Sequence, residues 1–114
     1  DFIGEANFLK AIVSDQDMVT VEGVNLKLNT GDIPNGSACS LILRPEAVRL
    51  DDTGLIPCKV TFSCFMGAYQ IYHVTVGETN VVIHDYNPRN KKIYSEGDTA
   101  YLNFSEDSVS IIRV

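Results

Sequence analysis

Residues 58–64 read CKVTFSC, and this stretch decides the fold class because its apolar side chains alternate with polar ones. A period of two is typical of a strand with one buried face. Residues 69–76 and 80–86 repeat the pattern around a glycine-led turn and predict a hairpin. The alternation also predicts that Cys58 and Cys64 both point toward the core.

Further strands are predicted on both sides of this stretch, between turn signals made of Gly, Asp and Asn. No segment predicts a long helix. About nine short strands favour a closed or nearly closed OB-like β-barrel, because closure hides strand edges. An immunoglobulin-like sandwich is the second choice, but it calls for a buried Trp and the chain has none. The additional strands are predicted at residues 8–13, 18–22, 24–28, 37–44, 99–104 and 109–112, with a bend at Glu22-Gly23.

Composition limits the function classes. A chain of 114 residues with 45% hydrophobic content supports one compact core. The net charge of -6 and the scattered Lys and Arg residues disfavour nucleic acid as a partner. Three cysteines without a C-x-x-C pair predict neither a disulfide framework nor a zinc site, and fit a reducing compartment. No apolar run is long enough to cross a bilayer.

Several segments resemble, in order along the chain, the C-terminal regulatory part of ATP-binding subunits of polyamine-type and iron-type ABC importers. Residues 2–9 (FIGEANFL) resemble the segment that leaves the ATPase domain, and residues 43–50 (LRPEAVRL) resemble the Arg-Pro-Glu element. Residues 65–69 (FMGAY) are similar to the family's Phe-x-Gly-x-x-Tyr pattern, with the Tyr one position nearer. Residues 97–102 (GDTAYL) resemble the late Gly-Asp strand entry.

The resemblance implies a transport-associated OB (TOBE) domain, a β-barrel appended to an ATPase domain and involved in subunit pairing and sensing. It implies a single regulatory unit over residues 1–114, in which residues 1–35 continue from the ATPase domain and residues 36–114 form the barrel. ATP and Mg²⁺ would bind in the ATPase domain of the same chain, not in this segment. The implied partners are a homodimer mate and, indirectly, the membrane permease subunits. The implied location is cytoplasmic, at the inner face of the cell membrane.

The sequence itself predicts no catalytic residues and no cofactor. It has no G-x-x-x-x-G-K-[ST] loop, so this segment cannot bind ATP in the P-loop manner. The alternative function is an OB module that binds a small ligand, a polyamine or an oxyanion, directly. The acidic balance suits a cation better than an anion.

Arg44, Glu46 and Arg49 are the first candidate site. Pro45 fixes the local backbone and holds Arg44 extended, and one turn is predicted over residues 46–50. A preset cluster of this kind suits a subunit contact or an anion contact through a guanidinium group. The alternative is an intrachain ion pair that holds the loop of the barrel, and both interpretations stay open.

The second candidate site is the aromatic junction of Phe65, Met66, Gly67 and Tyr69. These side chains would line a groove for a partner or, as the alternative, belong to the core. Gly67 indicates a bulge or a close approach of another backbone. Whether residues 2–13 complete a sheet of their own chain or of a neighbouring chain also stays open.

The two histidines are the third candidate. A tight turn at Glu78-Thr79 would place His73 directly opposite His84, on the exposed face of the hairpin. Two imidazoles would be half of a transition-metal site, but the sequence offers no third ligand. An ordinary exposed hairpin face is the favoured interpretation, so no metal is predicted.

Overall fold

The computed structural model describes residues 6–88 and 91–114, and its regular elements are ten β-strands and two 3₁₀ turns. The predicted all-β class without a long helix is confirmed. In the described part, no helix is long and apolar enough to cross a membrane. The start of the resembling N-terminal segment, Phe2 to Glu5, lies outside the described residues. The strands are β1 (Asn7–Asp15), β2 (Met18–Val21), β3 (Val24–Lys27), β4 (Ala38–Leu43), β5 (Arg49–Asp51), β6 (Ile56–Phe65), β7 (Gln70–Val76), β8 (Thr79–Asp85), β9 (Thr99–Asn103) and β10 (Ser110–Arg113), and the turns are η1 (Pro45–Ala47) and η2 (Glu106–Ser108).

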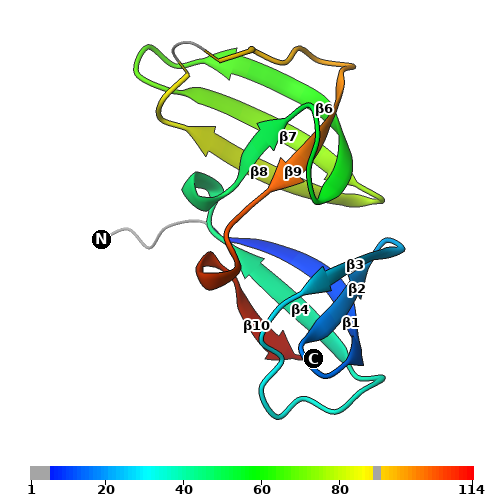
Figure 1. Ribbon diagram of the computed structural model, residues 1–114. Coiled ribbons are helices and arrows are strands. Elements are labelled where there is room, and N and C mark those ends of the chain that lie inside the picture. The colour runs from blue at the N-terminus through cyan, green and yellow to red at the C-terminus, as the bar shows by residue number, and fades with distance from the viewer. Residues whose placement is uncertain (1–5, 89–90) are drawn as a thin grey trace.

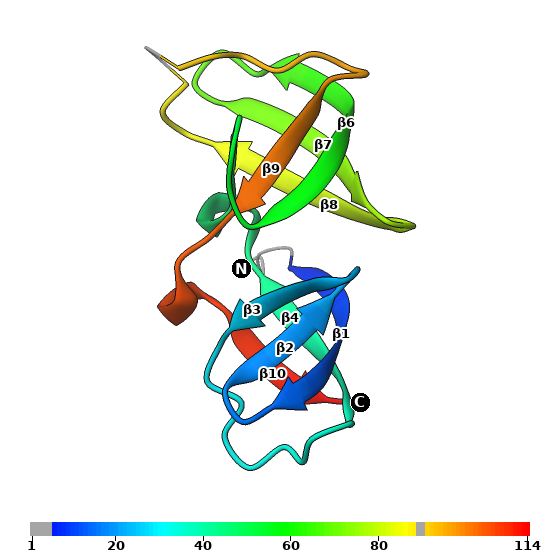
Figure 2. The same cartoon turned by 45° about the vertical axis from the view of Figure 1, so that its right-hand side comes forward.

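The strands form two antiparallel sheets of five strands each, which lie one above the other in Figure 1. The first sheet has the order β10-β4-β1-β2-β3, and the second has the order β5-β9-β6-β7-β8. The chain crosses between them twice, through η1 and through η2 (Figures 1 and 2). The predicted division of the chain at residue 36 stays a prediction, and the first sheet contains strands from both sides of that position.

The predicted closed barrel is wrong, because neither sheet closes on itself. The exposed edge strands are protected from pairing with other chains in other ways. Three edge strands, β3, β5 and β10, have only three or four residues, and short edges offer little to a foreign strand. The long edge strand β8 meets a side chain instead: Asn7 Nδ2 donates to Val82 O, and Val82 N donates to Asn7 Oδ1, both at 2.9 Å.

The buried faces follow the predicted alternation. In β1, residues 7, 9, 11 and 13 point inward and residues 8, 10 and 12 point outward. The hairpin predicted at Glu22-Gly23 is confirmed, with Val21 paired to Val24. Both central residues have positive φ, 48° and 80°, as a type I′ turn requires. The buried side chains form one hydrophobic cluster. Strands β1, β2 and β4 contribute to it from the first sheet, and strands β6 to β9 contribute from the second sheet.

Two strand predictions need correction. Ten strands are present where about nine are predicted, because Arg49–Asp51 pairs with β9 instead of continuing a turn. In β6, the pairing with β7 shifts between Val60 and Phe62, which is a β-bulge. A one-residue shift moves every later side chain to the opposite face. Phe62 is therefore 44% exposed, and Cys64 lies on the outer face and not in the core.

The long connection between β8 and β9 is anchored by Tyr94, which is buried. Its hydroxyl donates to Asp52 Oδ1 at 2.7 Å, and its backbone N–H donates to the Tyr72 hydroxyl at 3.2 Å. Burial raises the pKa of Tyr94, and its hydrogen bond to Asp52 acts in the same direction. Hydrogen bonds from Tyr94 and Lys92 lower the pKa of Asp52. Burial of Tyr94 thus holds this connection against the second sheet.

Candidate functional site

The Arg-Pro-Glu element forms the turn η1 between the two sheets, beside β8 (Figure 1). Arg44 is extended, with φ -76° and ψ 144°, as expected for a residue before proline. Ala47 N donates to Arg44 O at 3.0 Å, and Pro45 is buried. The turn is shorter than predicted, because the chain enters β5 at Arg49. A buried proline thus holds a turn whose flanking charged residues face solvent.

The charged side chains of this element do not pair with one another. Arg44, Glu46 and Arg49 are all exposed. Among residues 6–88 and 91–114, the ion pairs do not include Arg44 or Glu46. Arg49 Nε lies 3.5 Å from Asp51 Oδ2, on the same strand, and both side chains are 57% exposed. An exposed pair of this kind contributes at most about 1 kcal/mol and does not connect the turn to another element.

A groove of about 260 Å³ lies where this element meets the end of β8. Glu46 and Arg49 line one wall, and His84 with Tyr86 lines the other. Lys91 and Asp85 also line the groove and form an ion pair, with 3.4 Å between Lys91 Nζ and Asp85 Oδ1. Charges of both signs therefore surround the groove. Its full lining is Glu46, Ala47, Val48, Arg49, His84, Asp85, Tyr86, Asn87 and Lys91.

Tyr69 connects the second candidate site to this groove. Its ring lies 4.8 Å from the ring of Tyr86 and 5.6 Å from that of His84, between centroids. The Tyr86 hydroxyl lies 3.4 Å from His84 Nδ1. The structure thus brings Tyr69 together with Glu46 and Arg49 through His84 and Tyr86, a connection that the sequence analysis missed.

Phe65 and Met66 do not join the groove. They are 60% and 50% exposed, so the interpretation that assigns them to the core is wrong. Gly67 has φ 95° in the turn between β6 and β7, where Met66 N donates to Tyr69 O at 2.8 Å. A Cβ on Gly67 would meet no atom within 4 Å, so the glycine serves the turn and not a close backbone approach.

The histidine prediction is wrong in register. Val76 pairs with Thr79 across a two-residue turn at Gly77 and Glu78, so His73 lies opposite Val82 and His84 opposite Ile71. Gly77 has φ 59°, which suits the first central position of a type II′ turn. His73 packs on Phe62 instead, with ring centroids 5.0 Å apart. The described residues contain no group of three or more His, Cys, Asp or Glu side chains that could hold a metal.

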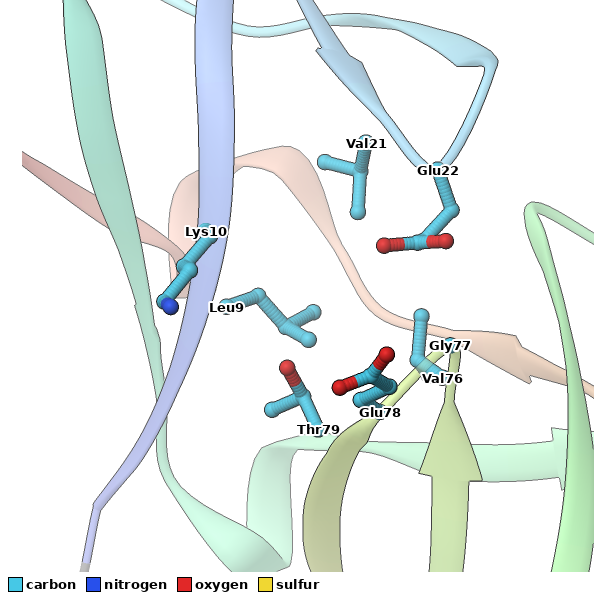
Figure 3. Close-up of a pocket in the computed structure, with 8 residues that line it drawn as sticks. All are labelled: Leu9, Lys10, Val21, Glu22, Val76, Gly77, Glu78 and Thr79. Atoms are coloured by element: carbon cyan, nitrogen blue, oxygen red, sulfur yellow. The ribbon is translucent and has the colours of Figure 1, made fainter.

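A second hollow lies between the tips of two hairpins, one from each sheet (Figure 3). Glu22 and Glu78 point their carboxylates into it, and Leu9, Val21 and Val76 give it an apolar side (Figure 3). The volume is about 380 Å³. The Glu22 carboxylate lies directly over Gly77, where an added Cβ would come within 2.5 Å of Glu22 Cδ. Sequence reasoning gave Glu22 and Glu78 no role because they only marked turns.

The sequence profile of the family described as "TOBE domain" matches residues 41–112. That range begins in β4 and ends in β10, so it contains both the Arg-Pro-Glu element and the aromatic junction.

Two curated proteins are similar over nearly the whole chain. The spermidine/putrescine import ATP-binding protein PotA of Ruegeria pomeroyi is 28% identical over an alignment of 126 positions that covers 99% of this chain and 33% of that protein. The Fe(3+) ions import ATP-binding protein FbpC of Pasteurella multocida is 27% identical over an alignment of 118 positions that covers 99% of this chain and 32% of that protein. The chain spans about a third of the length of these relatives.

Proposed function

Because this chain belongs to the TOBE domain family, we propose that it is the regulatory module of an ABC importer's ATP-binding subunit, with no chemistry of its own. The similarity to PotA and FbpC, which are both named import ATP-binding proteins, supports this proposal. An ATPase domain in the same polypeptide would bind ATP and Mg²⁺. The module would lie at the cytoplasmic face of the membrane. Its association with the permease subunits would be indirect, through the rest of the transporter.

The proposed task of the module is to pair two ATP-binding subunits. The single observation that carries this proposal is the exposure of Arg44 and Glu46, which make no ion pair within the described part of the chain. Pro45 restricts the backbone of this turn, so less backbone conformational entropy is lost when the two residues bind a partner. The neighbouring groove adds Tyr86 and Arg49, and Tyr and Arg are common anchors in protein interfaces.

Replacement of Arg44 and Glu46 by alanine is expected to dissociate the dimer. Truncation of charged groups at an interface centre costs about 2 kcal/mol or more, which is roughly a thirtyfold weaker association. Size-exclusion chromatography with light scattering measures the dimer fraction, and circular dichroism checks that the variant remains folded. The matched control is R113A/E106A, which removes two exposed charges elsewhere. A wild-type chain that stays monomeric at high concentration contradicts the pairing role.

Direct binding of a small cationic ligand is the second candidate function. The hollow of Figure 3 supports it, because its lining has two carboxylates, Glu22 and Glu78, against one ammonium group, that of Lys10, and an apolar side. An alkyl diamine would place its ammonium groups near Glu22 and Glu78 and its methylene groups against Leu9 and Val76. PotA is named for spermidine and putrescine import, which makes these amines the natural probes.

Calorimetric titration with spermidine and with putrescine tests this candidate. Binding is expected to weaken by roughly a hundredfold or more in E22Q/E78Q, since each of the two lost charge-assisted hydrogen bonds is worth about 1.5 kcal/mol or more. The control E96Q removes one exposed carboxylate far from the hollow in sequence. No heat of binding in the wild type, or equal affinity in the double variant, contradicts the candidate.

A further inference from the structure

The side of the first sheet that faces away from the core carries an apolar patch. In β1, Phe8 and Ile12 point outward and are 54% and 53% exposed. Phe8 lies beside Ile42 of β4 on this side. Ile112 of β10 lies on the same side, because its partner Ser40 and Ile42 are two residues apart on β4, and it is 47% exposed. Phe8, Ile12, Ile42 and Ile112 form the outer patch.

The outer patch has a polar neighbour on the same sheet. Thr20 of β2 and Asn25 of β3 also face outward, and Thr20 Oγ1 donates to Asn25 Oδ1 at 2.8 Å. Outward positions of an antiparallel sheet with one solvated face are normally polar in this way. Contiguous apolar side chains with a polar rim mark a surface that another protein covers. The outward side of β1, β4 and β10 therefore differs from that of β2 and β3 and indicates a partner.

A groove of about 600 Å³ extends the patch beyond Ile12. Ala38 and Val114 line it together with Ile12, and Val114 is 83% exposed. The outward side of the sheet thus offers a hollow that can receive a protruding side chain of the partner.

Lys10 supplies a positive charge within this apolar surface. It lies between Phe8 and Ile12 on β1 and lines the groove. The ion pairs formed by residues 6–88 and 91–114 do not include it. Glu22 also lines the groove, but its carboxylate lies over Gly77, and Figure 3 shows the Lys10 side chain pointing away from it. A partner that covers Lys10 must offer it a carboxylate, because a buried unpaired ammonium group is costly.

The proposed function supplies the partner. PotA and FbpC are about three times as long as this chain and are named ATP-binding proteins, so the proposed subunit carries an ATPase domain in the same polypeptide. Residues 2–9 resemble the segment that leaves this domain, and Phe8 lies within them. The covalent link then holds the ATPase domain near the patch at an effective concentration on the order of millimolar. At that concentration even a modest apolar surface is covered.

A second copy of this chain suits the outer patch less well. The outward residues of β1, β4 and β10 around Lys10 are apolar or carry hydroxyl groups. A copy packed through the same surface would therefore offer Lys10 these groups in place of a carboxylate.

We propose that the outer patch is the surface on which the ATPase domain of the same polypeptide docks, with apolar groups over Phe8, Ile12 and Ile112 and a carboxylate opposite Lys10. The inference rests on the proposed function, because it requires that domain. Interfaces between domains of one chain bury about 600 to 1,500 Å². Docking through the first sheet would leave the groove at the Arg-Pro-Glu element free, so docking and subunit pairing would use different surfaces.

Photo-crosslinking in the full-length subunit identifies the occupant. p-Benzoylphenylalanine at position 12 is expected to crosslink to the ATPase domain of the same polypeptide. The matched control carries it at position 93, because Ile93 is 46% exposed and lies in the connection between β8 and β9, and is expected to lose this crosslink. Crosslinks from position 12 to a second copy, or none to the ATPase domain, overturn the proposal.

Hydroxyl-radical oxidation of the full-length subunit measures how far the patch is covered. Phe8 and Phe65 are 54% and 60% exposed in this chain, so docking is expected to make Phe8 react several-fold more slowly than Phe65. The variant I112D is expected to abolish this protection, and the control I93D to retain it. Likewise K10E is expected to weaken the protection, and K27E, on β3 of the same sheet, to leave it unchanged. Equal rates for Phe8 and Phe65, or equal effects of K10E and K27E, overturn the proposal.

Two further results separate this inference from the proposed function. A full-length subunit that binds ATP but leaves Phe8 as reactive as Phe65 overturns the inference alone. A full-length polypeptide that does not bind ATP overturns the proposed function, and the inference with it. Protection of Phe8 is expected to be independent of protein concentration and to persist in R44A/E46A, whereas protection that is lost on dilution would mean that a second copy covers the patch and overturns the inference.

Discussion

Replacement of Asn7 by alanine is expected to lower the free energy of unfolding by about 2 to 3 kcal/mol, as measured by urea denaturation. Asn7 is 7% exposed, and its side-chain amide makes two hydrogen bonds of 2.9 Å with the backbone of Val82. Alanine removes the side-chain Oδ1 acceptor and Nδ2 donor of Asn7. The N–H and C=O groups of Val82, at the edge of β8, then lose these hydrogen-bond partners. Hydrogen exchange of the Val82 amide is expected to accelerate by a similar free energy.

Two control variants separate this hydrogen bonding from simple side-chain loss. Asn80→Ala removes an exposed asparagine from the same strand, β8, and is expected to change stability by less than about 0.5 kcal/mol. Asn7→Asp keeps the shape but cannot donate to Val82 O when it is ionised, so it is expected to destabilise at least as much as alanine at pH 7. A loss below about 0.5 kcal/mol in both Asn7 variants would contradict the role of Asn7 as the link between the sheets.

The role of Asn7 could be anticipated in part from the sequence. The alternation of β1 puts Asn7 on the same face as Leu9, Ala11 and Val13, and a buried asparagine needs hydrogen-bond partners. In the sequence, Asn7 stands out only as a member of the segment at residues 2–9 that resembles the exit from the ATPase domain. Its partner, Val82, is 75 residues away. A side chain that bonds to a distant strand edge leaves no signal in local periodicity, so the link between the sheets had to come from the structure.

Local pattern was reliable where turn chemistry was explicit and failed where one residue shifts the register. The Glu22-Gly23 bend is correct because Gly23 suits the second central position of the type I′ turn that joins Val21 to Val24. The bulge at residue 61 carries no glycine or proline, so the alternation of residues 58–64 gives the wrong face for Phe62 and Cys64. The prediction for the histidines was wrong for the same reason. The turn lies at Gly77-Glu78 and not at Glu78-Thr79, so the partner of His84 on β7 is Ile71 and not His73, two positions away.

The spacing of residues along the chain predicts only part of the candidate groove. The sequence indicates the cluster of Arg44, Glu46 and Arg49 because Pro45 lies within it. The effect of a proline on the backbone is local, so it can be predicted from the sequence. Their proximity to His84 and Tyr86 depends on how η1 packs beside β8, which is a tertiary arrangement. Closure of the barrel failed as a prediction for the same reason, because β8 stays an edge strand and its Val82 bonds to the side chain of Asn7, where a closed barrel would have another strand.

Replacement of Gly54 by alanine is expected to destabilise the chain by about 3 kcal/mol. A Cβ on Gly54 would overlap the side-chain amide of Asn103. That amide accepts a hydrogen bond from Leu55 N and donates one to Thr53 O, both at 3.0 Å, and so holds the loop that follows β5. The variant must displace Asn103 and break both bonds, which combines overpacking with unsatisfied polar groups. Urea denaturation measures the loss.

A double-mutant cycle distinguishes this clash from a preference of the backbone alone. In an Asn103→Ala background the overlap is absent, so Gly54→Ala is expected to cost only the backbone strain of a side chain at φ 156°, about 1 kcal/mol or more, with a coupling energy near 2 kcal/mol. Gly31→Ala is a control for positive φ without a side-chain contact, because Gly31 has φ 57° and no atom lies within 4 Å of an added Cβ, and it is expected to cost about 1 kcal/mol. Additive losses in the cycle would mean that Gly54 is required for its conformation and not for its contact with Asn103. Asn103 also pairs with Arg49 in the ladder between β5 and β9, so the residue that holds this loop lies beside the start of the strand that brings Arg49 to the candidate groove.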